Sequence, residues 1–168
     1  MFNNVMWATD GSENADQALG CAVQIAQREN AHLHVAHVAH VAHVAHVVEK
    51  LVTGRVAGQN VRLDEPELEA KIEAQTATAA NQGIKATLHR HVGPAAHVAK
   101  ELAKVAQESD ADLIVIGTRG RSSLTGLMLG SVSQQLLHVA HCPVLAVPPA
   151  AVTQREPGEH EAVATTTS

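Results

Sequence analysis

The sequence predicts a single-domain α/β fold: a doubly wound (Rossmann-like) sheet of five mostly parallel strands with helices on both faces. Short apolar runs typical of strands alternate with longer segments of helical periodicity through most of the chain. The run "DLIVIG" at 112–117 is continuously apolar, as expected of a strand that is covered on both faces. A length of 168 residues suits one domain with a proper core and is short for two.

The first strand and helix are predicted at the start of the chain. The short apolar run "NNVMWAT" (3–9) ends at Asp10-Gly11-Ser12, a turn whose side-chain oxygens can cap a helix. Apolar residues then keep helical spacing over 13–30, which predicts a helix. The next strand candidate is "LHVAHV" at 33–38.

The second half of the chain continues the alternation. A helix is predicted over 65–82, because Pro66 suits a first helical position and Gly83 a helix end. The alternating stretch 85–92 predicts a strand, and a helix follows the turn at Gly93-Pro94. After the strand at 112–117 come a predicted helix at 131–141 and a last strand at 143–148. The domain therefore spans 1–148, and the tail 149–168 has too little to pack and is expected to be disordered.

Composition excludes several classes of partner. One Trp, one Phe and no Tyr leave no stacking platform for single-stranded nucleic acid, and a net charge of −5 argues against a duplex-binding surface. No apolar run is long enough to cross a bilayer, and the N-terminus shows no signal peptide, so we expect a cytoplasmic protein without a membrane partner. Two cysteines, Cys21 and Cys142, do not form a disulfide framework.

The glycine-rich stretch "GTRGRSSLTGLMLGS" (117–131) lies between a predicted strand and a predicted helix. Glycine lets the backbone approach a ligand closely, and the first amides of a helix are unpaired and favour negative charge. The groups available to an anion are the backbone at Gly117, Gly120 and Gly130, the hydroxyls of Ser131 and Ser133, and the cations Arg119 and Arg121. This set suits a polyphosphate; a loose surface loop before an ordinary helix cap remains the alternative.

The pattern Gly117-x2-Gly120-x9-Gly130-Ser131 resembles the G-2x-G-9x-G-[ST] signature of the universal stress protein family, specifically its ATP-binding branch. "MWATDGSENADQAL" is similar to the opening strand and helix of the family, and residues 108–148 to its last third. The similarity covers roughly residues 2–148, with 40–65 outside it. It implies a nucleotide-binding domain over 1–148 that contains a His-Val-Ala repeat at 34–48.

The resemblance also implies a set of nucleotide contacts. The residues concerned are Ala8, Thr9, Asp10, Val38, Ile116, Gly117, Arg119, Gly120, Gly130, Ser131, Val132 and Ser133. Asp10 has a second interpretation as the cap of the first helix, and the repeat leaves Val47 as an alternative to Val38. The implied cofactor is ATP, with Mg or Mn as the accompanying ion.

The function that the resemblance implies is a regulatory, stress-response role for bound ATP, exerted through a protein partner or through assembly. Relatives commonly dimerise along the last strand, here 144–147, which predicts a homodimer. No G-x-x-x-x-G-K-[ST] loop and no general base for phosphoryl transfer can be assigned, so little or no hydrolysis is expected. A slow ATPase and a family member that binds no nucleotide remain alternatives.

The histidine tract consists of four "HVA" triplets over 34–45, followed by "HVV". A period of three sends successive histidines to opposite faces of a strand and makes them drift around a helix, so a closed metal site would need other ligands. We interpret the tract as a local repeat expansion whose first part forms the second strand. A histidine-rich metal binder stays open as the alternative.

Overall fold

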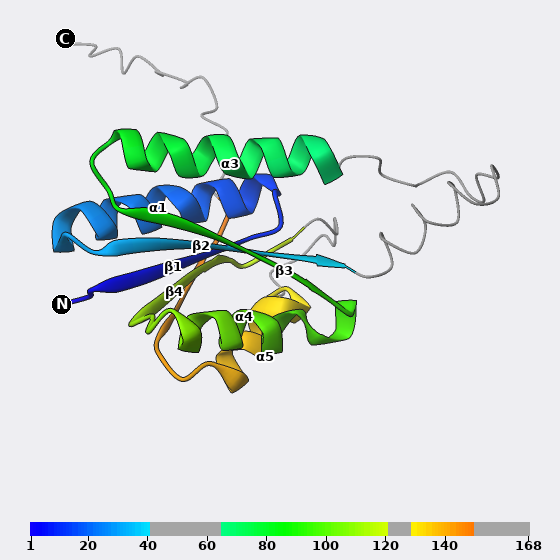
Figure 1. Cartoon of the computed structure of the whole chain (residues 1–168). Helices are drawn as coiled ribbons and strands as arrows, with labels where there is room; N and C mark the ends of the chain where they lie inside the picture. Colours follow the sequence, from blue (N-terminus) through cyan, green and yellow to red (C-terminus); the bar gives the residue numbers. More distant parts are fainter. Residues whose placement is uncertain (41–64, 121–128, 150–168) are drawn as a thin grey trace, which may run out of the picture.

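The computed structural model describes residues 1–40, 65–120 and 129–149. Five strands form one sheet in the order β3-β2-β1-β4-β5, and every neighbouring pair is parallel. The strands are β1 (Asn4–Thr9), β2 (His32–His40), β3 (Ala86–Gly93), β4 (Leu113–Gly117) and β5 (Val144–Val147) (Figure 1). The predicted α/β fold with a parallel five-stranded sheet is confirmed.

Among the described residues, two helices cover each face of the sheet (Figure 1). On one face lie α1 (Glu13–Glu29) and α3 (Glu65–Asn81); on the other lie α4 (Val98–Glu108), preceded by the 3-10 turn Ala95–His97, and α5 (Ser131–Val139). Strand order reverses at β1, because β2 and β3 extend to one side of it and β4 and β5 to the other. In such sheets the ligand site lies beyond the carboxyl ends of the strands at this reversal.

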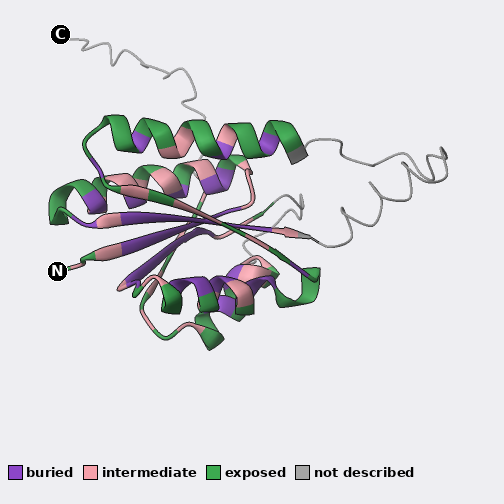
Figure 2. Ribbon diagram, in the orientation of Figure 1, coloured by how far each residue is buried: buried purple, intermediate pink, exposed green. Residues whose placement is uncertain are grey.

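The sheet separates two apolar cores, as expected when both of its faces are covered (Figure 2). Trp7 is fully buried on the α1 face, and its indole donates a hydrogen bond of 2.9 Å to the carbonyl of Ala15. A row of buried alanines on α1, from Ala15 to Ala26, lets this helix approach the strands closely. The core is otherwise built from Val, Leu and Ile, because the chain has almost no other aromatic residues.

Most predicted element ends lie within one residue of the structure, and two differ by two residues. β2 runs to His40 instead of stopping at 38, and it places His34 and His37 on opposite faces, as the period of three predicts. α5 ends at Val139 instead of 141, because Ala140 is extended and Cys142 precedes Pro143, which disfavours helical backbone.

Some predictions lie outside the described residues: the rest of the histidine repeat at 41–48, the Val47 alternative, and the tail from 150 onward. Both cysteines are free and half-buried. Within 1–40, 65–120 and 129–149, no helix combines the length and the apolar character needed to span a membrane.

Candidate functional site

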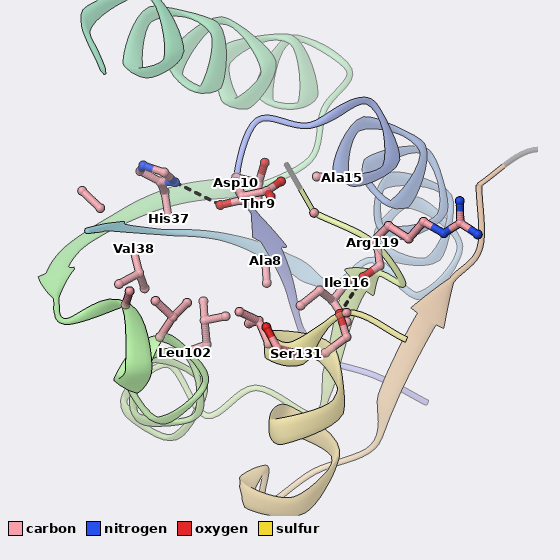
Figure 3. Close-up of a pocket in the computed structure, with 18 residues that line it drawn as sticks. Ala8, Thr9, Asp10, Ala15, His37, Val38, Leu102, Ile116, Arg119 and Ser131 are labelled. Atoms are coloured by element: carbon pink, nitrogen blue, oxygen red, sulfur yellow. Dashed lines mark hydrogen bonds between the residues drawn. The ribbon is translucent and has the colours of Figure 1, made fainter. Parts of the chain in front are cut away.

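A cavity of about 340 Å³ opens at the carboxyl ends of β1, β2 and β4, where strand order reverses (Figure 3). All twelve residues singled out in the sequence line it. They come from three separate parts of the chain: the end of β1, the end of β2, and the stretch from β4 to α5. The sequence therefore predicted which residues the fold brings together around this cavity.

The N-terminus of α5 faces this cavity. Gly130 is the N-cap residue and has no side chain, so no side-chain oxygen caps the helix. The backbone amides of Ser131, Val132 and Ser133 belong to the first turn, which has no intrahelical acceptors. These amides and the helix dipole together favour an anionic group at this end of the cavity.

The glycines of the motif are required by close packing against the protein itself. A Cβ at Gly120 would lie 2.7 Å from Oδ2 of Asp10, and one at Gly117 would lie 2.8 Å from Oδ1 of Asn14. A Cβ at Gly130 would lie 3.1 Å from the carbonyl oxygen of Thr118. The sequence-based interpretation assigned these glycines to ligand approach; the structure adds that they let the loop pack onto β1 and α1.

Several groups that the sequence offered to an anion are already engaged. The hydroxyl of Ser133, 4% exposed, donates to the carbonyl of Gly117 at 2.8 Å. The amide of Arg119 donates to Asn14 at 2.7 Å, and that of Gly130 to Thr118 at 2.6 Å. The guanidinium of Arg119 extends away from the cavity (Figure 3). Among the described residues, the expected donors are thus narrowed to the amide of Gly120, the first-turn amides of α5 and the hydroxyl of Ser131, while Arg121 lies outside the described residues.

Asp10 does not cap α1. Ser12 is the N-cap residue, and its hydroxyl accepts a hydrogen bond of 3.2 Å from the amide of Ala15. The carboxylate of Asp10 accepts the amide of Ser12 at 3.0 Å through Oδ1 and turns Oδ2 toward Gly120. Asp10 therefore shapes the turn after β1 and borders the glycine loop, which leaves it at the rim of the cavity.

The sequence did not single out six further lining residues. They are Ala15, His37, Ala39, Ala95, Val98 and Leu102. Val98 and Leu102 are buried residues of α4 and, with Val38 and Ile116, give the cavity part of its apolar lining. The helical spacing of the α4 residues predicted burial, but only the tertiary fold shows that they border a cavity.

His37 is the buried polar member of this set. It is 6% exposed, and its Nδ1 lies 3.0 Å from the carbonyl oxygen of Thr9. A carbonyl oxygen only accepts, so Nδ1 carries the hydrogen and Nε2 of the neutral ring is an acceptor. Nε2 is buried and has no hydrogen-bond partner within the part of the chain that the structure describes. The repeat hid this residue, because every third position of the tract is a histidine.

His32 and His34 of β2 form a cluster with His89 of β3, and none of the three lines the cavity. Nδ1 of His34 lies 3.0 Å from Nε2 of His89, and the rings of His32 and His34 are 4.0 Å apart. Burial, followed by the neighbouring His32, His89 and Lys85, lowers the pKa of His34 to about 4. Within the described ranges, no group of three or more His, Cys, Asp or Glu side chains is arranged to hold a metal ion.

Comparison with known proteins assigns the family. The model of the universal stress protein family matches residues 1–148, which include every described strand and helix. The chain belongs to the universal stress protein family. Universal stress protein YxiE of Bacillus subtilis is 36% identical over 153 residues, which cover 88% of this chain and 99% of YxiE.

Solved structures of universal stress proteins share the fold. The hypothetical protein MJ0577 superposes with a TM-score of 0.71 at 24% identity, covering 89% of this chain and 97% of that protein. A universal stress protein solved in complex with cAMP has a TM-score of 0.59 at 24% identity, over 87% of this chain and 96% of its own. The universal stress protein from Archaeoglobus fulgidus in complex with dAMP has a TM-score of 0.57 at 23% identity, covering 88% of this chain and 98% of that protein.

Proposed function

We propose that this universal stress protein binds ATP or a related adenine nucleotide in the cavity between β1, β4 and α5. The observation that carries the proposal is the uncapped N-terminus of α5, where the amides of Ser131, Val132 and Ser133 face the cavity. Such a helix end favours a phosphate, because its amides donate hydrogen bonds and its dipole favours negative charge.

The apolar lining of the cavity suits a planar apolar ring. Val38, Val98, Leu102 and Ile116 line it, and no side chain among these four carries a polar atom. Adenine is the base we propose, because two structural neighbours bind adenine nucleotides, cAMP in one and dAMP in the other. The residues thus divide into an apolar end for the base and an amide-rich end for the phosphates.

We propose a regulatory role with little or no hydrolysis. Asp10 and Arg119 are the only formally charged side chains among the described residues that line the cavity. Phosphoryl transfer normally needs a lysine or arginine on the phosphates and a group that orients the nucleophile. A Mg or Mn ion that accompanies ATP would be held mainly by the phosphates and water, with Asp10 as the one described carboxylate at the cavity.

The bound nucleotide would act through assembly or a protein partner. β5 is an edge strand, and Leu145 on it is 38% exposed. We propose that this edge pairs with a second copy to form a homodimer, which would cover its unpaired backbone groups.

The test is a calorimetric titration of the purified chain with ATP and, separately, with adenosine. We expect one ATP site per chain. Adenosine should bind more weakly by about tenfold or more, because it has no phosphate to accept hydrogen bonds from the α5 amides. Absence of ATP binding would contradict the proposal. Phosphate release measured on the same sample separates a slow ATPase from a non-hydrolysing binder, and a zinc titration tests the metal-binding alternative.

A further inference from the structure

We propose that Asn14 is a positioning residue for the phosphate-binding loop, the segment between β4 and α5 of which the structure describes 118–120 and 129–130. Asn14 holds the start of this loop at the carboxyl end of β5. The inference rests on the proposed function, because it assigns a role in holding the phosphate end of that cavity. Asn14 does not line the cavity, and its action is therefore indirect.

The side chain of Asn14 bridges two segments that are far apart in sequence. It is 7% exposed, and its Oδ1 accepts a hydrogen bond of 2.7 Å from the amide of Arg119. Its Nδ2 donates a hydrogen bond of 3.2 Å to the carbonyl of Val147, the last residue of β5. One planar amide thus satisfies a donor in the loop and an acceptor on the edge strand, which fixes its orientation.

Further bonds complete the base of the loop. The amide of Thr118 donates to the same carbonyl of Val147 at 2.9 Å, and the carbonyl of Thr118 accepts the amide of Gly130 at 2.6 Å. Gly117 allows this arrangement, because a Cβ there would lie 2.8 Å from Oδ1 of Asn14 and 3.0 Å from its backbone carbonyl carbon. Thr118 and Arg119 are therefore held by α1, β5 and the N-cap of α5 together.

The local structure of α1 does not require an asparagine at this position. Ser12 already caps the helix, and asparagine is a weak helix former because its amide competes for backbone groups. Here the side-chain amide of Asn14 instead forms hydrogen bonds with Arg119 of the loop and Val147 of β5. Without it, the part-buried amide of Arg119 would lose its bond to Asn14 and the carbonyl of Val147 would lose one donor, and a group left unpaired away from water is costly. Asn14 thus holds the loop backbone in the position from which Gly120 and α5 meet a phosphate.

The binding test compares Asn14→Ala with Asn81→Ala, the same change at an exposed position of α3. Asn14→Ala is expected to weaken ATP binding about tenfold, the equivalent of one hydrogen bond, and to leave adenosine binding unchanged. Asn81→Ala should bind both ligands like the original chain. An equal loss for ATP and adenosine, or no loss for either, would overturn the positioning role. If the original chain binds no adenine nucleotide, the proposed function fails instead.

Amide hydrogen exchange without ligand provides the second measurement. The amide of Arg119 should exchange slowly in the original chain and in Asn14→Asp, which keeps the accepting oxygen, and rapidly in Asn14→Ala. Rapid exchange at Arg119 in the original chain would overturn the proposal even if Asn14→Ala did not fold. Slow exchange in a folded Asn14→Ala would overturn it equally.

Discussion

Close contacts with individual neighbouring atoms explain why the motif residues of this protein are glycines. Gly120 lies against the carboxylate of Asp10, and Gly117 against the amide of Asn14, at distances that leave no room for a Cβ. The resemblance to the family indicated twelve residues that all line the cavity. It could not predict the role of Asn14 or His37, since neither has a sequence signal that distinguishes a site residue from an ordinary helix or repeat residue.

The packing at Gly120 predicts a specific loss of binding. Gly120→Ala should weaken ATP binding by about tenfold or more, because the added carbon displaces Asp10 or the loop at an overpacking cost of about 1–3 kcal/mol. Gly20→Ala is the matched control: its Cβ meets nothing within 4 Å, and it should bind normally and gain about 0.5–1 kcal/mol of stability in α1. Calorimetry and urea unfolding measure both. Equal ATP affinity in the two variants would show that the close approach of Gly120 to Asp10 is not needed for ATP binding.

Protonation of His34 predicts a loss of stability in acid. Its pKa is lowered from 6.5 to about 4 by burial and by His32, His89 and Lys85, so the unfolded chain takes up a proton between these values and the folded chain does not. The contribution is fully present above pH 6.5 and decreases as the pH falls toward 4, by at most about 1.4 kcal/mol per pH unit.

Urea unfolding at about pH 7 and about pH 5 measures this contribution, with His34→Gln as the variant that cannot titrate at this position. We expect the variant to lose less stability between the two conditions than the original chain. His32 and His89 also have lowered pKa values, mainly through burial, so part of the dependence should remain. An unchanged pH dependence in His34→Gln would refute the assignment.

At the scale of elements, α5 combines a polar end with an apolar anchor. Its first turn faces the cavity, while Leu136 further along is fully buried in the core beneath the sheet. Periodicity predicted this helix but extended it by two residues, because it does not register that Pro143 disfavours helical backbone in the residue before it. β2 was predicted too short for a different reason: a three-residue repeat carries no signal for where a strand ends.

The anchor of α5 can be tested with two adjacent leucines. Leu136→Ala should lower the free energy of unfolding by about 2–5 kcal/mol, because it leaves a cavity in the core. Leu137, 50% exposed, should tolerate alanine within about 0.5 kcal/mol. Chemical denaturation of the two variants measures the free energy of unfolding. Similar losses of stability in both would mean that α5 does not pack as described.

For the whole molecule, the sheet order β3-β2-β1-β4-β5 brings distant segments to one site. Alternation of strands and helices predicted a parallel sheet, and the composition of "DLIVIG" predicted a covered central strand. Strand order was not predicted, because no local pattern in the sequence states which strands are neighbours. The same order leaves β3 and β5 at the edges of the sheet.

If the proposed homodimer forms through β5, a charge placed on β5 and a charge placed on β3 should affect dimerisation differently. Leu145→Asp on β5 should convert the dimer into a monomer, since a charge at the centre of an interface would lose its hydration. Val92→Asp on β3, 62% exposed in the single chain, places the same charge at the other edge and should leave the dimer intact. Light scattering after size exclusion gives the masses. A monomeric original chain, or dissociation by Val92→Asp alone, would contradict the β5 interface.

The most direct measurement is a two-dimensional amide NMR titration of the original chain with ATP. Binding at the α5 N-terminus predicts that the largest shifts fall on the amides of Gly120, Ser131, Val132 and Ser133, and that adenosine moves them much less. If ATP leaves these four amides unmoved, or shifts only residues remote from them such as those of the His34–His89 cluster, the nucleotide site is elsewhere or absent.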